Sequence, residues 1–334
     1  TAAGPGWMFP EQLLTRPDLC PNSLRFPSLD VHLLSLLPAA TEIISWLGAT
    51  DHLVGITHEC DYPPGIATRP RVTRARVPSH LDGDHAPLEI DAAVRAASGA
   101  GEPLFALDEP TITALHPDVI FTQALCDVCA VSETDVRALA ARLPSPPTVV
   151  TLGGTSIDGI LNDVRRVAVA LGIEDEADEL LAGERARLRA VHDTLKAAKA
   201  PRPRVLLIEW TDPVFLAGHW GPEQIHRAGG LDVLGVVGAH STTRTIAECA
   251  AAVPDIVLIA PCGYDLHAAR GEAMRLMAHP DWQWLLGTQV WALDANGLIS
   301  RPGPRVVDGV EAMARIFHPT LFTGLDPRHA ERIG

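Results

Sequence analysis

Lysine is scarce in this sequence, since Lys196 and Lys199 are the only two among 334 residues. The 27 basic side chains are outnumbered by 41 acidic ones, which gives a formal net charge of −14. A protein of that charge repels phosphate backbones and anionic lipid headgroups. We therefore do not expect nucleic acid or an anionic membrane surface to be a partner.

Long hydrophobic runs are missing as well. No apolar stretch reaches the roughly 18–20 residues that a membrane-spanning helix needs. The segment from Thr1 to Pro10 lacks the basic head and apolar core of a signal peptide. The sequence leaves two compartments open: the cytoplasm, or an extracytoplasmic space if a signal has been removed.

Catalytic signatures are also absent, because the sequence has no Gly-x-Ser-x-Gly elbow, no phosphate loop and no Gly-x-Gly-x-x-Gly after a predicted strand. Cysteine is too rare for a disulfide scaffold at this length. Free thiols are the simpler expectation for the six cysteines: Cys20, Cys60, Cys126, Cys129, Cys249 and Cys262.

The hydrophobic pattern predicts an α/β fold. A short apolar strand from Leu33 to Leu37 precedes a helix that Pro38 opens and Gly48 ends, and a second strand begins at Leu53. Strand, helix and strand in this order form a βαβ unit, which implies a parallel sheet. A similar alternation begins again at Val205.

Two segments with the same plan indicate a duplicated lobe. Pro117-Asp118 precedes the apolar strand 119–122, and Pro254-Asp255, 137 positions later, precedes the strand 256–259. A cysteine-containing loop follows each strand. We therefore expect two Rossmann-like lobes with parallel sheets and a ligand cleft between them.

The long segment between the lobes is rich in Ala, Leu, Glu and Arg, and it predicts one rigid helix of roughly 25 residues. Such a helix would brace the lobes and keep domain closure small. The expected division of the chain is an N-terminal extension (1–30), an N-terminal lobe (31–173) with an insertion (75–106), the connecting helix (174–200) and a C-terminal lobe (201–334).

Ligands of open parallel sheets bind beyond the carboxyl ends of the strands. The loops at those ends carry both tyrosines of the chain and four of its six cysteines. Two facing lobes would bring these loops together across a groove, which suits a small-molecule ligand. The candidate ligand-binding residues are His58, Cys60, Asp61, Tyr62, Gln123, Cys126, Cys129, Trp210, His219, Trp220, Cys262, Tyr264 and Arg301.

The pair Cys126-x-x-Cys129 is open to three interpretations. As half of a zinc site it needs two more ligands, which His58 and Cys60 could supply if the cleft closes. A thioredoxin-like role needs the pair at a helix N-terminus, and a helix is predicted to begin near Ser132. The third possibility is two partly buried thiols that shape a ligand loop.

The run from Leu34 to Glu42, Leu-Ser-Leu-Leu-Pro-Ala-Ala-Thr-Glu, resembles the opening strand and helix of helical-backbone substrate-binding proteins of ABC transporters. The strand 53–57, the Pro117-Asp118 strand, the long helix and Gly229-Gly230 fit the same pattern. The resemblance covers residues 31–318 and is nearest to the vitamin B12-binding proteins. It implies two α/β lobes joined by a rigid helix, with the ligand between them.

Within this resemblance, Asp61-Tyr62-Pro63-Pro64 is similar to the first ligand loop of the B12-binding proteins, whose tyrosine touches the corrinoid. The family docks to its transporter through one glutamate on each lobe. Glu133 matches the first, and Glu223 is the glutamate close to the second.

The expected function is non-enzymatic binding of cobalamin or a related corrinoid by a monomer, without a cofactor and with an ABC-transporter permease as a possible partner. Tyr62 and Trp220 would pack on the ring system. His219, Arg301 and the backbone around Cys126 and Cys129 would meet amides or a phosphate, and His58 or His219 could reach the metal. The alternatives are a chelatase or thiol-dependent reductase on a related fold, and a haem or siderophore receptor.

Overall fold

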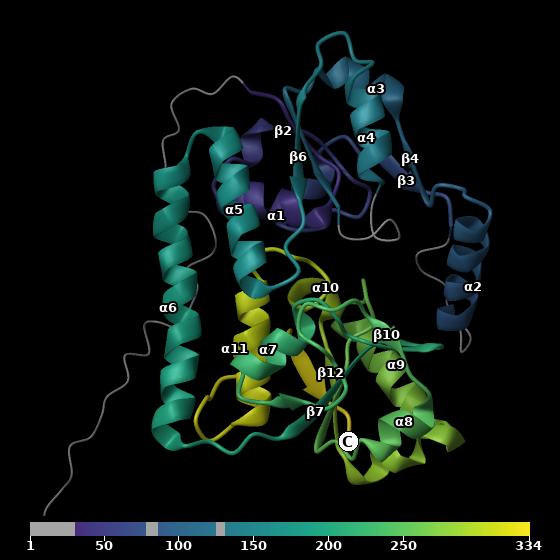
Figure 1. Cartoon of the computed structure of the whole chain (residues 1–334), viewed down its shortest axis with the longest axis vertical. Coiled ribbons are helices and arrows are strands. Elements are labelled where there is room, and N and C mark those ends of the chain that lie inside the picture. The colour runs from purple at the N-terminus through teal and green to yellow at the C-terminus, as the bar shows by residue number, and fades with distance from the viewer. Residues whose placement is uncertain (1–30, 78–85, 125–130) are drawn as a thin grey trace, which may run out of the picture.

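Two α/β lobes are stacked along the long axis of the molecule, and one long helix runs along one side (Figure 1). The computed structural model describes residues 31–77, 86–124 and 131–334. The predicted extension (1–30), Cys20, Cys126 and Cys129 lie outside these ranges.

The N-terminal lobe is built on a parallel sheet, as the βαβ pattern predicted, and its four strands have the order β2-β1-β5-β6. Leu33 and Leu34 pack into different hydrophobic clusters, so both faces of the sheet are covered. One cluster includes α1 and α5, and the other includes α3 and α4. The elements are β1 (Leu33–Ser35), α1 (Pro38–Trp46), β2 (Leu53–Ile56), α3 (Glu109–Leu115), β5 (Val119–Gln123), α4 (Glu133–Ala140), β6 (Thr148–Leu152) and α5 (Ile157–Leu171).

A protrusion from this lobe occupies the predicted insertion, 75–106. Its base is an antiparallel pair formed by β3 (Thr73–Ala75) and β4 (Phe105–Leu107), and it carries the helix α2 (Ala86–Gly99). The lobe also has short 3-10 turns, η2 (Thr50–His52) and η3 (Ile66–Thr68).

The sheet of the C-terminal lobe is mixed, which corrects the expectation of a wholly parallel sheet. Its centre, β7-β11-β12, is parallel, whereas β8, β10 and β13 are antiparallel to their neighbours. The turn between β7 and β8 is too short for a crossover, and only antiparallel strands can be joined so closely. The strands are β7 (Arg204–Thr211), β8 (Val214–Leu216), β9 (Leu231–Asp232), β10 (Thr242–Thr243), β11 (Ile256–Ile259), β12 (Gln289–Leu293) and β13 (Ala330–Arg332).

Helices cover both faces of this sheet as well. Residues of α7 and α11 join the core cluster that also includes α1 and α5, whereas α9 packs on the opposite face. The helices of the lobe are α7 (Gly221–Arg227), α8 (Ile246–Ala251), α9 (Leu266–Ala278), α10 (Ala295–Leu298), α11 (Val306–Phe317) and the 3-10 segment η4 (Pro280–Gly287). No helix in the described ranges has the length and hydrophobicity that a bilayer crossing requires.

The connecting helix α6 (Glu174–Ala198) is continuous over 25 residues, which is close to the predicted 174–200. It packs against α5 of one lobe and α11 of the other. The guanidinium of Arg187 on α6 bonds to Glu184 at 2.8 Å, Asp308 at 2.6 Å and Glu311 at 2.9 Å. Burial alone would lower the pKa of Arg187, but the three carboxylates outweigh it and raise the pKa. This cluster fixes α6 to the C-terminal lobe.

Replacing Arg187 with Met should lower the free energy of unfolding by about 3–5 kcal/mol, because buried carboxylates lose their cation. Urea unfolding followed by circular dichroism measures the change. Arg189→Met on an exposed position of the same helix is the control and should change stability by less than about 0.5 kcal/mol. Equal losses in the two variants would contradict the role of the cluster.

Candidate functional site

A cleft of about 1180 Å³ lies between the lobes and is lined by residues of both lobes and of α2. It is formed at the carboxyl ends of parallel strands: Leu37 and Pro38 follow β1, Gln123 ends β5, and Cys262 follows β11. This is the location that the sheet topology predicted. Ten of the candidate residues line it, namely His58, Cys60, Asp61, Gln123, Trp210, His219, Trp220, Cys262, Tyr264 and Arg301.

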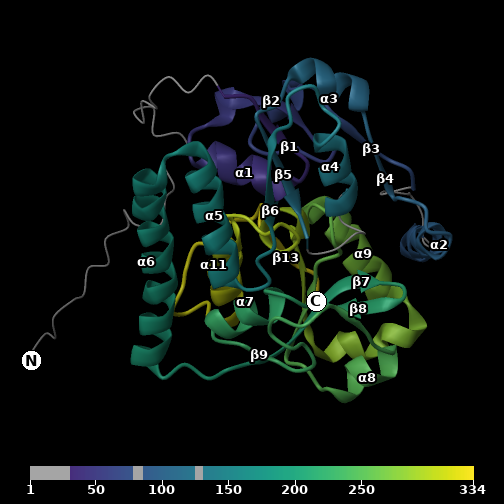
Figure 2. The same cartoon turned by 45° about the horizontal axis from the view of Figure 1, so that its top comes forward.

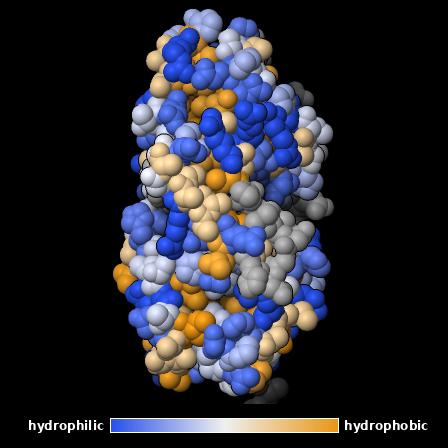
Figure 3. Space-filling view, turned by 90° about the vertical axis from the view of Figure 1, so that its right-hand side faces the viewer, coloured by the Kyte–Doolittle hydropathy of each residue, from blue (hydrophilic) through white to orange (hydrophobic). Residues whose placement is uncertain are grey.

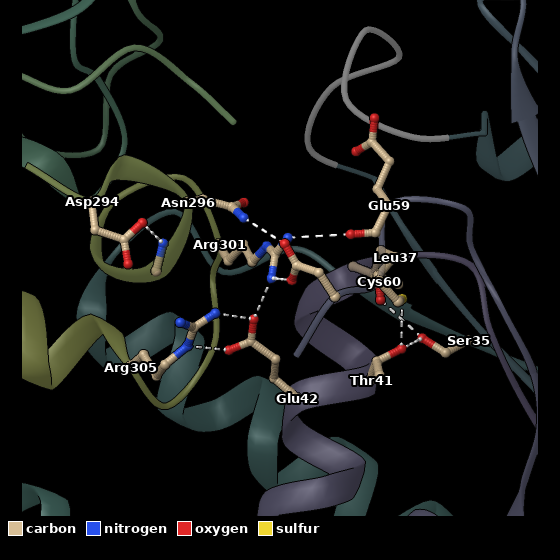
Figure 4. Close-up of polar contacts among 12 residues, drawn as sticks. Ser35, Leu37, Thr41, Glu42, Glu59, Cys60, Asp294, Asn296, Arg301 and Arg305 are labelled. Carbon is tan, nitrogen blue, oxygen red and sulfur yellow. Dashed lines mark hydrogen bonds and ion pairs between the residues drawn. The ribbon is translucent and has the colours of Figure 1, made fainter. Parts of the chain in front are cut away.

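A buried ion cluster joins the lobes at the base of the cleft (Figure 4). Glu42 on α1 is 3% exposed, and its carboxylate accepts hydrogen bonds from Arg301 at 3.0 Å and from Arg305 at 2.8 and 2.5 Å. Burial alone would lower the pKa of both arginines, but the hydrogen bonds that they donate to carboxylates, together with the charge of those carboxylates, outweigh it and raise the pKa. Both guanidinium groups are therefore charged, and the Glu42 carboxylate between them ties α1 to the C-terminal lobe.

A second carboxylate, that of Asp61, reaches Arg301 from the N-terminal lobe. Its Oδ1 lies 2.5 Å from Nη1 of Arg301, and its Oδ2 accepts a bond from Asn296 at 2.8 Å. Burial alone would raise the pKa of Asp61, but the hydrogen bond and charge of Arg301 hold it below its ordinary value. Arg301, which lines the cleft, thus already has two carboxylate partners, Glu42 and Asp61.

Tyr62 was expected to contact the ligand, and in the structure its ring contacts Arg305 of the C-terminal lobe. The guanidinium carbon of Arg305 lies 4.2 Å from the centre of the Tyr62 ring, a cation–π contact. Tyr62 is not among the described residues that line the cleft. A ring contact between Tyr62 and a ligand stays a prediction.

These aromatic residues form one wall of the cleft. The rings of Trp210 and Tyr264 meet edge to face with their centres 5.9 Å apart. Trp220 is largely buried, and its Nε1 donates to the carbonyl of Ile299 at 2.7 Å. Phe215 on β8 also lines this wall. Such a surface is suited to a large flat apolar ligand.

Two histidines in the cleft present buried imidazole nitrogens. Nε2 of His58 and Nε2 of His219 are buried without a hydrogen-bond partner. Burial lowers the pKa of both, with a further contribution from Arg71 at His58 and from His240 at His219. Both rings are therefore neutral at pH 7, the form in which imidazole binds a metal.

The position of His219 is fixed by its backbone. It has a positive φ of 52°, which is uncommon for a residue with a side chain. A Cβ on the preceding Gly218 would lie 2.4 Å from the Ser241 nitrogen, so the loop can approach only a glycine there. This packing places the His219 ring 5.2 Å from that of His240, edge to face.

The described cysteines of the cleft differ in environment. Cys60 is buried, its sulfur lies 3.0 Å from Oγ1 of Thr41, and burial raises its pKa to about 11. Cys60 is therefore a thiol at neutral pH. Cys262 lies exposed at the opposite side. Within 31–77, 86–124 and 131–334, no group of three or more His, Cys, Asp or Glu side chains is arranged to hold a metal ion.

The two glutamates expected to dock a transporter have partners within the chain. Glu133 begins α4 and accepts bonds from Arg137 at 2.7 Å and Thr151 at 2.8 Å. Glu223 on α7 accepts a bond from the backbone nitrogen of Ile157 at 2.8 Å, so it bridges the lobes. Docking through Glu133 and Glu223 stays a prediction.

Comparison with known proteins shows similarity in structure rather than in sequence. No family model matches the sequence, and neither does any curated protein. A periplasmic haem-binding protein from Pseudomonas aeruginosa matches with a TM-score of 0.68 and 20% identity over 91% of this chain and 98% of that one. The chain has the fold of a two-lobed substrate-binding protein.

Two other solved structures support that conclusion. The periplasmic haem-binding protein BhuT, solved with two haems, matches with a TM-score of 0.64 and 24% identity over 87% of this chain and 98% of its own. The periplasmic vitamin B12-binding protein BtuF of Vibrio cholerae matches with a TM-score of 0.60 and 19% identity over 88% and 98%. The resemblance inferred from the sequence is confirmed at the level of the fold.

Several cleft residues were missed by the sequence analysis. They include the inward face of α2. The sequence analysis also missed Glu42, which lies in the middle of α1 and is the carboxylate partner of both Arg301 and Arg305. The insertion was recognisable in the sequence, but nothing in the sequence indicated that its helix turns toward the cleft.

Stability should decrease as the pH falls below about 6.5, the ordinary pKa of histidine. Because the pKa of His219 is lower in the folded protein, the unfolded chain takes up the proton first. The stability that the neutral imidazole contributes at higher pH is therefore lost as the pH falls. His219→Asn keeps a residue that tolerates positive φ and should show a smaller loss of melting temperature between pH 7 and 5. An unchanged slope in this variant, or an imidazole pKa above 6.5 by NMR, would contradict the assignment.

Proposed function

We propose that the protein binds one corrinoid, cobalamin or a close relative, in the cleft between its lobes. The cleft of about 1180 Å³ exceeds the range of about 300–1,000 Å³ usual for small-molecule pockets. It therefore suits a ligand larger than a typical metabolite. The wall formed by Trp210, Phe215 and Tyr264 offers the apolar contact that a broad macrocycle needs.

The observation that carries the choice of a corrinoid is the excess of acidic over basic side chains in the cleft lining, where two of the three arginines are already paired with carboxylates. Arg301 is bound to Glu42 and Asp61, Arg95 lies 2.6 Å from Asp91, and Arg71 donates to a backbone carbonyl. The acidic residues of the lining outnumber these arginines: Glu59, Asp61, Asp91, Glu209 and Asp265. A haem or an iron siderophore brings carboxylates or similar anions, whereas a corrinoid presents mostly neutral amides around its ring.

A haem is the second candidate. The neutral imidazoles of His58 and His219 favour it, because imidazole is a good ligand for iron as well as for cobalt. The enzymatic alternative, a chelatase or thiol-dependent reductase, gains no support from Cys60, because a pKa of about 11 leaves little thiolate at pH 7.

The fold also supports a place for this protein in transport. We propose that it works outside the cytoplasm as a monomer and passes its ligand to an ABC-transporter permease, with Glu133 on the N-terminal lobe as a docking residue. The match to two-lobed periplasmic binding proteins over most of both chains supports this proposal.

Calorimetric titration tests the ligand. Hydroxocobalamin or cyanocobalamin should bind in a 1:1 complex, and haemin should bind more weakly, because its two propionates would meet a lining in which acidic side chains outnumber arginines. Absorption spectra recorded in parallel show whether an imidazole reaches the metal. No heat change at about 100 µM of either cobalamin would overturn the proposal, since even a 100 µM affinity is about 5.5 kcal/mol and measurable.

Asp61→Asn tests the argument from charge. The variant keeps an oxygen near Arg301 but removes the negative charge, so haemin should bind about tenfold more tightly, as expected for one new charge-assisted hydrogen bond. Cobalamin affinity should stay within about threefold. Asp51→Asn, at a fully exposed position of the same lobe, is the control and should bind both ligands as the wild type does. Unchanged haemin affinity in the Asp61 variant would contradict the argument.

A further inference from the structure

The helix α2 lies beside the gap between the lobes, on the side away from α6 (Figures 1 and 2). The helices α5 and α6 run along the opposite side of the molecule. Figure 3 views the molecule from the α2 side, where hydrophilic and hydrophobic residues are interspersed. The helix belongs to the insertion 75–106, so it is an addition to the two sheets that form the rest of the cleft.

One face of α2 is directed into the cleft. The lining includes Ile90, Asp91, Val94, Arg95 and Ser98, which are spaced as neighbours on one side of a helix. Ala96 lies two positions beyond Val94, about 200° around the helix, and is exposed. The helix therefore has an inward face and an outward face that can be tested separately.

Contacts at its first turn hold α2 against the C-terminal lobe. Nε1 of Trp210 on β7 donates to the carbonyl of Pro87 at 3.1 Å. Ala86, Pro87 and Ile90 are buried. The same Trp210 packs against Tyr264 in the aromatic wall, so α2 continues that wall.

We infer that α2 is a third binding surface for the ligand, in addition to the two lobes, and that Val94 is a specificity-determining residue. This inference rests on the proposed function. Ile90 and Val94 contact the apolar edge of the macrocycle that would otherwise face solvent between the lobes. Asp91 and Ser98 flank them and are placed to accept hydrogen bonds from amide groups at the ring periphery, while Arg95 stays paired with Asp91.

Two arginine substitutions on the same helix test the inference. Val94→Arg puts a long charged side chain into the cleft and should weaken hydroxocobalamin binding at least tenfold. Ala96→Arg adds the same side chain to the outward face, and its affinity for hydroxocobalamin should stay within about threefold of that of the wild type. A milder variant, Val94→Ser, removes apolar contact area, so it should bind hydroxocobalamin about fivefold more weakly than the wild type. Circular dichroism and the melting temperature check that each variant folds.

The outcomes separate this inference from the proposed function. If the wild type binds hydroxocobalamin and both Val94 variants bind it as tightly as Ala96→Arg, the role of α2 is overturned and the proposed function stands. If the folded wild type binds no cobalamin, the proposed function is overturned and the inference falls with it. Weaker hydroxocobalamin binding in the folded Val94 variants than in Ala96→Arg supports both the role of α2 and the proposed function.

Discussion

The arrangement of the two lobes depends on one buried carboxylate. Glu42 comes from the first helix of the N-terminal lobe, and its two partners, Arg301 and Arg305, come from a loop and helix start more than 250 residues later. A charge this deeply buried is tolerated only where partners surround it. Separation of the lobes at this point would break the three hydrogen bonds that Glu42 accepts from Arg301 and Arg305. Together with α6, which packs against α5 and α11, this contact joins the two lobes.

The same contact influences which ligands the cleft can accept. Arg301 would be the natural partner for an anionic group, but Glu42 and Asp61 already neutralise it. Under the proposed function, selection would depend on shape, aromatic contact and neutral donors and acceptors. Burial also lowers the pKa of His58 and His219 and so favours their uncharged form at neutral pH.

Structures with this fold include proteins described as binding haem and vitamin B12, so the scaffold does not by itself define the ligand. The sheets place the loops at a common edge, and the side chains of those loops then determine the chemistry. In this chain the helix α2 adds residues from outside both sheets, which makes the insertion part of the cleft rather than a surface decoration.

The sequence by itself determined the local elements. The strand at Leu33, the helix that Pro38 begins, the Ser132 cap of α4 and the unbroken helix α6 all follow from short-range patterns and match the structure closely. Only the tertiary structure decided that Tyr62 faces Arg305, that Glu42 binds two arginines, that α2 lines the cleft and that the second sheet is mixed. Apolar periodicity and capping act over a few residues, whereas these features depend on packing between residues far apart in the chain.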